Sequence, residues 1–369
     1  MPSQRKVRLS MNDNEPSLFP NDTLASSAAA NPVMVQVLRG ASIESAHRGA
    51  AAVVDATGEL IAAWGNIERP IYPRSAIKPL QALALVETGA ADACRASDEE
   101  LALACASHNG EPAHVTLAGG WLARLGLSPQ DLECGAHPPL GRKPAEALIA
   151  AATPPLTLHN NCSGKHTGML ATAQHLGEPT QGYVGIDHPV QVRIRDLLGE
   201  MTDSEMAQAP VGADGCSIPT YALPLRGIAR AMARFAAPDT LGPTRGQAAQ
   251  RIARALVAHP FMIAGSGRFD TQMISRSAGA ALVKTGAEGV YAAAVPASGM
   301  QRGLGIALKI DDGATRAAEV AIAAVLRYLE VLDDNAWLRL ESIARPQLKN
   351  WRGIETGVIE VAPGWLARD

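Results

Sequence analysis

The sequence predicts an α/β fold of the α+β type, in which one antiparallel sheet is built from both ends of the chain. Three observations support this. Strand-like apolar runs occur at residues 33–39 and 50–64 and return at 279–313. Alanine-rich stripes at helical spacing fill the middle of the chain. A long amphipathic helix follows the last strand. Helices flanking the sheet and an inserted helical region would complete the core.

The sheet is expected from two segments, about 32–74 and about 275–369. In the first, residues 50–64 predict a hairpin because Ala56-Thr57-Gly58-Glu59 separates two apolar runs. In the second, residues 279–296 predict a strand, a turn with Gly286 and Gly289, and another strand. A third strand is expected at 304–313, followed by the amphipathic helix at 314–332.

The inserted helical region is expected over about 79–270. Its apolar stripes predict helices at 79–90, 98–106, 112–125, 145–152, 166–176, 190–199, 221–236 and 243–258. Residues 265–270 (GSGRFD) are rich in glycine but lack the pattern of a phosphate-binding loop. A flexible loop that caps a cleft is expected there. Residues 1–31 are polar and predict a flexible N-terminal extension, so residues 32–369 are interpreted as a single domain.

Composition limits the classes of function. The 369 residues carry a net charge of −3, with 33 Lys+Arg against 36 Asp+Glu, so nucleic acid is not an expected partner. No apolar run approaches the roughly 18 residues of a membrane helix. The start lacks the apolar core of a secretory signal. The odd number of cysteines favours a reducing cytoplasm; they are Cys94, Cys105, Cys134, Cys162 and Cys216.

Ser75 and Lys78 form an S-x-x-K motif at the start of a helical pattern. Positions i and i+3 share a helix face, so the lysine amine can reach the serine hydroxyl. A serine needs a base to become a nucleophile at neutral pH. A lysine can be that base only where burial or a nearby cation lowers its pKa. Alone, the motif fits equally a helix-capping serine and a solvated lysine.

Two later motifs strengthen the catalytic interpretation. Ser107-His108-Asn109 follows a helical stretch, and Lys284-Thr285-Gly286 follows an apolar strand. This order, S-x-x-K, S-x-N and K-T-G, is typical of serine β-lactamases and penicillin-binding proteins. Two serines and two lysines facing one cleft would form two Ser–Lys pairs.

The segments RSAIKPLQ, ASHNGEP, NNCSGKHTGML, DGCSIPT and KTGAEG extend the similarity. With them the sequence resembles the rhizobial-type (class 3) L-asparaginases of the asparaginase II family, from about residue 33 to the C-terminus. The resemblance implies a serine-β-lactamase-like, penicillin-binding-protein-like fold for the catalytic domain. It also implies hydrolysis of L-asparagine to L-aspartate and ammonia, and a homodimer.

The resemblance assigns roles to residues of this chain. Ser75, with Lys78 as its base, would be the nucleophile, and Ser107 paired with Lys284 would relay protons. Cys162, Lys165 and Cys216 match a metal site of the family, expected to hold zinc. On sequence alone the two cysteines are interpreted as small buried core residues and Lys165 as a surface charge; it is the resemblance that favours a metal site.

An α-amino acid substrate needs a cation for its carboxylate and an anion for its ammonium group. Arg74, beside Ser75, can clamp a carboxylate. Asp214, near Cys216, is the expected ammonium partner. His166 could bond either end, and Asn109 and Thr285 are further candidates for polarising the side-chain amide.

Two other classes of function stay open at this point. One is another hydrolase on the same fold: a β-lactamase, D-peptidase or esterase. The other is a binding protein that kept the scaffold without catalysis. The intact Ser and Lys positions favour an enzyme over a binding protein.

Overall fold

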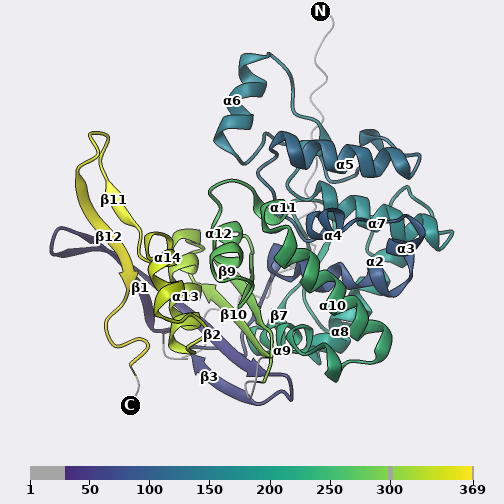
Figure 1. Ribbon diagram of the computed structural model, residues 1–369. Helices are drawn as coiled ribbons and strands as arrows, with labels where there is room; N and C mark the ends of the chain where they lie inside the picture. The colour runs from purple at the N-terminus through teal and green to yellow at the C-terminus, as the bar shows by residue number, and fades with distance from the viewer. Residues whose placement is uncertain (1–29, 298–301, 368–369) are drawn as a thin grey trace, which may run out of the picture. The chain divides into compact units, whose positions relative to one another are not determined.

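The computed structural model describes residues 30–297 and 302–367. The extension predicted over residues 1–31 therefore lies outside the described residues, apart from its last two. Residues Asn31–Asp369 form one compact unit (Figure 1). Within the described part of this unit, no helix combines the length and the apolar character needed to cross a membrane.

An antiparallel sheet forms the centre of the unit. In the described residues it has the order β11-β12-β1-β2-β10-β9-β8, with β3 paired to β2. The bounds are β1 (Val33–Arg39), β2 (Ser42–Asp55), β3 (Leu60–Trp64), β8 (Leu282–Thr285), β9 (Val290–Val295), β10 (Leu304–Ile310), β11 (Gln347–Lys349) and β12 (Glu355–Val361). Because β2 pairs with β10, with Val53 opposite Ile306, the two ends of the chain meet in one sheet. The predicted architecture is confirmed.

Both predicted hairpins are present. Gly58 lies in the turn between β2 and β3 with a φ of 92°, and Gly289 lies between β8 and β9 with a φ of 67°. A side chain is strained in this left-handed region, so glycine is the residue these turns favour. Strands β11 and β12 fall within the second sheet segment, although no particular pattern marked them in the sequence.

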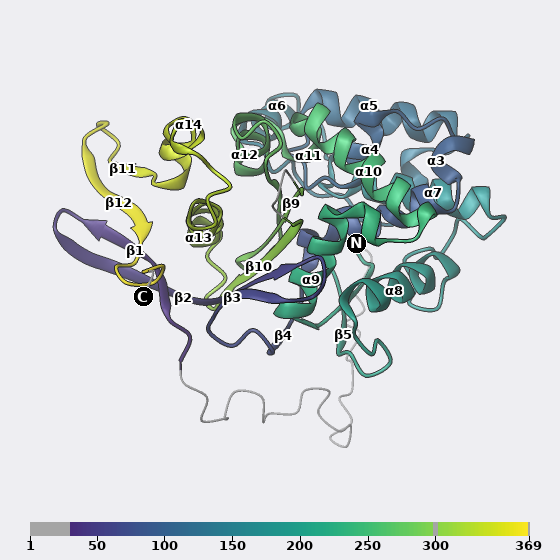
Figure 2. The ribbon, with the colours of Figure 1, turned by 60° about the horizontal axis from the view of Figure 1, so that its bottom comes forward.

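Helices pack against this sheet (Figure 2). Helix α9 (Leu225–Ala236) contacts β2, β9 and β10, and α13 (Thr315–Tyr328) contacts β1, β9, β10 and β12. Every residue of β9 is buried, as expected for a strand covered on both faces. A Cβ on Gly305 would lie 1.9 Å from the Ala229 carbonyl oxygen. Glycine at this point of β10 therefore allows α9 to pack closely.

The remaining helices lie mostly in the inserted region. They are α1 (Lys78–Gln81), α2 (Leu83–Glu87), α3 (Ala90–Ala93), α4 (Asp98–Ala104), α5 (Pro112–Arg124), α6 (Arg142–Ala150), α7 (Ser163–His175), α8 (Pro189–Thr202), α10 (Pro243–Ala258), α11 (Pro260–Ala264), α12 (Phe269–Arg276) and α14 (Asp334–Ala344). In the structure, the single helix predicted at 79–90 is broken into short helices. Two short ribbons complete the described structure. The strand β4 (Pro70–Ile71), before the insertion, pairs with β7 (Leu223–Pro224) inside it, and β5 (Val211–Ala213) pairs with β6 (Pro219–Tyr221).

Candidate active site

Ser75 and Lys78 lie where a short 3-10 helix, η2 (Arg74–Ile77), runs directly into α1. Ser75 is half-buried and Lys78 is fully buried. Pro79 lies in the first turn of α1, where a missing N–H costs little. Ile77, just before Lys78, has a φ of −101° and a ψ of 14°, outside the α-helical region. The side-chain geometry of a regular helix therefore does not hold between Ser75 and Lys78.

The K-T-G motif approaches this turn through its glycine. Segment η2 contacts both β8 and β9. A Cβ on Gly286 would lie 2.7 Å from the Pro73 carbonyl oxygen and 3.2 Å from Ala76 Cβ. Side chains do not tolerate the shorter of these distances, so glycine is what allows the end of β8 to reach the turn that carries Ser75.

Two buried lysine amines converge on one hydroxyl, that of Ser107. Lys78 Nζ donates to Ser107 Oγ over 3.0 Å, and Lys284 Nζ donates to the same oxygen over 2.9 Å. Lys78 also donates to Cys162 Sγ over 3.1 Å and to the Ala106 carbonyl. Ser107 thus connects amines from α1 and β8, which are far apart in the sequence.

This arrangement changes the predicted pairing in one respect. The contact between Ser107 and Lys284 matches the expected pair. Lys78, however, bonds to Ser107 and not to Ser75. Among the described residues the Ser75 side chain makes no hydrogen bond, while the Lys78 amine is engaged by Ser107, Cys162 and the Ala106 carbonyl.

Burial lowers the pKa of Lys284 to about 7. The amine is almost completely enclosed, and an enclosed cation loses its hydration. Asp270 opposes this shift, whereas the positive charges of Lys78 and Arg268 add to it. A group that titrates near neutral pH is suited to accept and return protons.

The backbone around Ser107 is held by the segment that follows α10. The Ser107 N–H donates to the Ile263 carbonyl over 2.9 Å, and the Asn109 N–H donates to the Ala264 carbonyl over 2.8 Å. Arg268 donates to Asn109 Oδ1 over 3.1 Å. The Asn109 amide nitrogen also bonds within the protein, to Glu111 and to the Ser266 carbonyl. Asn109 therefore fastens a loop in this structure.

Cys162, Lys165 and Cys216 lie together beside the lysine–serine cluster. Lys165 Nζ donates to Cys216 Sγ over 3.1 Å, and Cys162 Sγ is hydrogen-bonded to Asn161 Oδ1 over 2.9 Å. Interaction with Cys216, together with the charges of Lys78 and Lys165, holds the pKa of Cys162 well below its usual value despite burial. Interaction with Cys162 and burial raise the pKa of Cys216. The two thiols are therefore not equivalent, and Cys162 gives up its proton more readily than Cys216.

The same cluster acts on the pKa of Lys165. Burial alone would lower the pKa of the amine, but Cys216, Cys162 and Asp214 together raise it. In the described residues no three side chains of the His, Cys, Asp and Glu types form a metal-binding group. A metal at this cluster would therefore need Lys165 as a ligand. Two thiols and one amine are suitable donors for zinc.

Arg74 and Asp214 form an ion pair over 2.6 Å between η2 and the turn after β5. Arg74 adopts a φ of 52°, unusual for a residue with a side chain. Burial would raise the pKa of Asp214, but Lys165 and Arg74 outweigh it and lower the pKa. Arg74 adjoins Ser75 in the chain, and the ion pair holds Asp214 against Arg74.

His166 is fully buried on α7, and its protonation is set by Tyr183. The Tyr183 hydroxyl accepts from the Glu133 N–H over 2.9 Å and is hydrogen-bonded to His166 Nδ1 over 2.7 Å. When Tyr183 is the donor in the second bond, the ring hydrogen lies on Nε2, an atom that has no partner in the described structure. Burial lowers the pKa of His166, so the ring is a neutral hydrogen-bond donor.

Asp270 and Tyr291 were not identified from the sequence. Asp270 lies in the first turn of α12, where a flexible loop was expected, and is 1% exposed. It accepts a hydrogen bond from the Thr285 N–H over 3.2 Å. Thr285 is thus tied to α12 by its backbone, and its hydroxyl bonds only to the Gly286 carbonyl in the described structure. An acidic residue at a helix start was the available signal.

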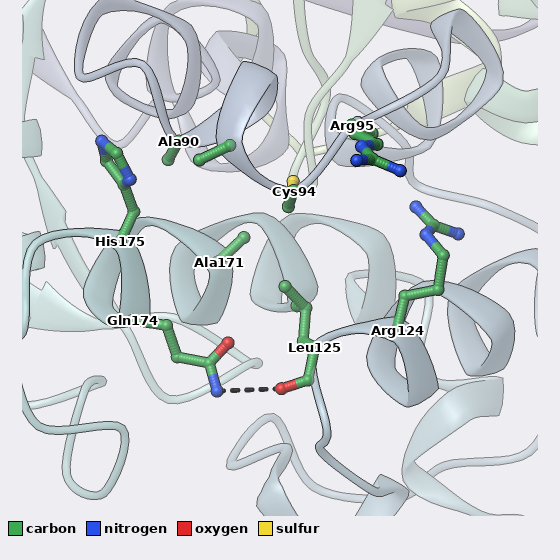
Figure 3. Close-up of a pocket in the computed structure, with 9 residues that line it drawn as sticks. Ala90, Cys94, Arg95, Arg124, Leu125, Ala171, Gln174 and His175 are labelled. Atoms are coloured by element: carbon green, nitrogen blue, oxygen red, sulfur yellow. Dashed lines mark hydrogen bonds between the residues drawn. The ribbon is translucent and has the colours of Figure 1, made fainter.

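A separate pocket of about 530 Å³ lies between α3, α5 and α7. Figure 3 shows Cys94 and Ala171 at its centre, Arg95 and Arg124 on one side and His175 on the other. None of the predicted site residues lines it. The buried lysines and serines, rather than this cavity, mark the candidate active site.

The family model described as L-asparaginase II matches residues 35–361, a range that contains every predicted site residue. No curated protein sequence matches the chain. A solved structure of the Bacillus subtilis glutaminase YbgJ, a covalent complex with 5-oxo-L-norleucine, is 14% identical over 77% of this chain and 88% of that chain, with a TM-score of 0.35. A Bacillus glutaminase in the presence of 4.3 M NaCl is 11% identical over 77% and 91%, with a TM-score of 0.36. Both likenesses are remote.

Proposed function

Because this chain belongs to the L-asparaginase II family of amidohydrolases, we propose that it hydrolyses L-asparagine to L-aspartate and ammonia. One observation carries the proposal. A buried chain of hydrogen bonds runs from Lys78 through Ser107 to Lys284, with distances of 3.0 and 2.9 Å. Such a chain can take a proton from a serine nucleophile and return it to a leaving group.

Ser75 is the nucleophile in this proposal. It is half-buried, whereas Ser107 is only 5% exposed, and a nucleophile must reach the substrate. Ser75 Oγ attacks the side-chain amide carbon, and its proton passes to the lysine–serine chain. The C–N bond then breaks, and the nitrogen takes a proton from the chain and leaves as ammonia. Water hydrolyses the resulting ester, which releases aspartate and restores the Ser75 hydroxyl.

The charged groups beside Ser75 match an α-amino acid. Arg74 and Asp214 face each other over 2.6 Å. We propose that the substrate inserts between them, its α-carboxylate on Arg74 and its α-ammonium group on Asp214. His166 Nε2 is buried and has no partner among the described residues, and as a donor it would bond a substrate oxygen. A peptide-bound side chain brings neither charge and so cannot replace the ion pair between Arg74 and Asp214. Free asparagine is therefore favoured over a peptide-bound side chain.

We also propose that Cys162, Lys165 and Cys216 hold zinc. Lys165 Nζ already contacts Cys216 Sγ over 3.1 Å, and Cys162 is the member whose pKa is lowered. When bound, the metal would supply Lewis acidity next to the substrate charges. Lys165 would first have to lose its proton, so zinc binding should be stronger at higher pH.

The test of the proposal is Ser75→Ala, assayed by ammonia release from L-asparagine. Activity should fall at least about 10³-fold, because the covalent route is lost. The melting temperature should not change, and Ser42→Ala, an exposed serine on β2, should match the wild type. Reaction of the wild type with 6-diazo-5-oxo-L-norleucine should place an adduct on the Ser75 peptide. Substantial activity in Ser75→Ala, or an adduct on Ser107, would remove Ser75 as the nucleophile.

Two assays separate this function from its rivals. A wild-type protein that hydrolyses a chromogenic cephalosporin but not asparagine would be a β-lactamase-type hydrolase. Thermal stabilisation by asparagine without ammonia release would indicate a binding protein. The homodimer implied by the family is part of the proposal and is tested by light scattering on the purified chain.

A further inference from the structure

Asp270 is a buried carboxylate with a defined place in the site but no part in the reaction proposed above. Oδ2 accepts the Thr285 N–H over 3.2 Å and lies 3.6 Å from Lys284 Nζ. Oδ1 accepts a hydrogen bond from the Tyr291 hydroxyl. Burial raises the pKa of Tyr291, so this hydroxyl keeps its hydrogen and remains a donor. Asp270 is thus fixed by β8 and β9 together.

The same segment also holds Ser107. Arg268, two residues before Asp270, donates to the Ser107 carbonyl over 3.3 Å. The start of α12 therefore contacts both partners of the 2.9 Å hydrogen bond between Lys284 and Ser107. Because this segment touches both Ser107 and Lys284, it can set the distance between the hydroxyl and the amine.

We propose that Asp270 is a positioning residue that holds the Lys284 amine against Ser107 and sets the pH at which this amine gives up its proton. The inference rests on the proposed function, in which Lys284 is the end of the proton chain. Through the Thr285 N–H, Asp270 fixes the end of β8. Through its charge, it favours the protonated form of Lys284 against the effect of burial.

The direction of the effect follows from the groups around the amine. Those that act on it are Asp270 and Arg268 at the start of α12, Lys78 of α1 and Cys162 before α7, while Tyr291 of β9 and Glu319 of α13 face Asp270. Without Asp270, burial, Lys78 and Arg268 would together lower the pKa of Lys284 further below its present value of about 7.

The experiment measures Lys284 directly in the full chain and does not depend on activity. Protein labelled with [¹³Cε]lysine is titrated by NMR, and the Lys284 signal is assigned by its loss in Lys284→Met. In Asp270→Asn the midpoint should fall by about one unit or more, the size expected for loss of a charge within about 4–6 Å. An unchanged midpoint would overturn the proposal.

Ammonia release in the same samples reports the proposed function separately. If the wild type releases no ammonia from asparagine, the proposed function fails, and the NMR midpoint still decides the role of Asp270 at Lys284. In an active enzyme the acidic limb of kcat/KM should shift to lower pH in Asp270→Asn with the NMR midpoint. A purely structural role would lower kcat and leave this limb in place.

Three further variants complete the experiment: one replacement for Asp270→Asn and two controls. Asp270→Ser also removes the charge and is smaller, so it replaces Asp270→Asn if that variant does not fold. Glu319→Gln tests a second buried carboxyl group near Asp270, whose pKa burial raises to about 7. In this variant the acidic limb of kcat/KM should stay in place. Asp55→Asn is the matched control: Asp55 is equally buried, but on β2, separated from β8 by β10 and β9. It should lose stability without a shift in the Lys284 midpoint.

Discussion

Lys284 and Lys165 are both buried amines, 1% and 4% exposed, yet their pKa values shift in opposite directions. For Lys284 burial prevails, and the pKa falls to about 7. For Lys165 the neighbouring thiols and Asp214 prevail, and the pKa rises. The difference lies in the contacts. Lys165 donates directly to Cys216 over 3.1 Å, whereas Lys284 donates to a neutral hydroxyl and lies 3.6 Å from a carboxylate oxygen.

Burial therefore does not by itself make a lysine a base. The neighbouring groups decide whether the amine gives up a proton near neutral pH or keeps it. The two lysines lie in one site. Lys78 connects their surroundings, because it contacts Ser107, the partner of Lys284, and also Cys162, which lies in the cluster of Lys165. We expect the two lysines to have separable roles, one in proton transfer and one in metal binding.

Lys284→Met should have the largest effect. It keeps the side-chain length but removes the amine, so kcat/KM for asparagine should fall by about 10²–10⁴-fold. In the wild type, kcat/KM should rise with pH through about 7, because the amine accepts a proton only after losing its own. This rise should disappear in the variant. A pH series of ammonia release measures both effects.

The matched control for that series is Lys349→Met. Lys349 is on β11, and its side chain is 55% exposed. Its removal should leave the rate and the pH profile unchanged. Near-normal turnover in Lys284→Met at pH 7 would exclude Lys284 from the proton chain and contradict the contrast with Lys165.

Lys165→Met comes next, and its expected effect is on the affinity for zinc. Loss of an outer-shell partner of a ligand typically weakens metal binding by about 10–100-fold, so loss of one of three protein ligands should weaken zinc binding by at least about that factor. Equilibrium dialysis and elemental analysis measure it. Cys94→Ser removes a half-buried thiol outside the cluster and should bind zinc like the wild type. If Lys165→Met retained full zinc affinity, or the wild type bound none, Lys165 would be only a counter-charge for the thiols.

The sequence predicted the sheet well because its strands carry continuous apolar runs. The strand at 33–39 and the hairpin around Gly58 appear as expected. Helix α12 was missed because Phe269–Arg276 is short and follows two glycines. Strand β11 was missed because Gln347–Lys349 is short and largely exposed. Neither segment has a periodic pattern of apolar residues long enough to predict a helix or a strand.

Some contacts of the site were also predicted from the sequence, and others were not. Motif order brought Ser107 and Lys284 together in the prediction, and they bond at 2.9 Å. The partner of Lys78 was assigned from helical spacing, but in the structure its amine bonds to Ser107, which lies after another helix. Asp270 carried no motif, and its role depends on contacts with β8 and β9 that only the fold creates. Spacing predicts partners within an element, and packing between elements decides the rest.

Tyr183→Phe should have the smallest effect and tests the side of the site next to Lys165. Without the hydroxyl, His166 Nδ1 has no donor and the ring can carry its hydrogen on either nitrogen. If Nε2–H bonds the substrate, KM should rise about 3–10-fold while kcat changes little, a loss of about one hydrogen bond. Tyr221→Phe is the matched control, because the Tyr221 hydroxyl is buried without a partner in the described structure. It should leave KM unchanged. An unchanged KM in Tyr183→Phe, or a fall in kcat alone, would mean that His166 supports the fold and does not contact asparagine.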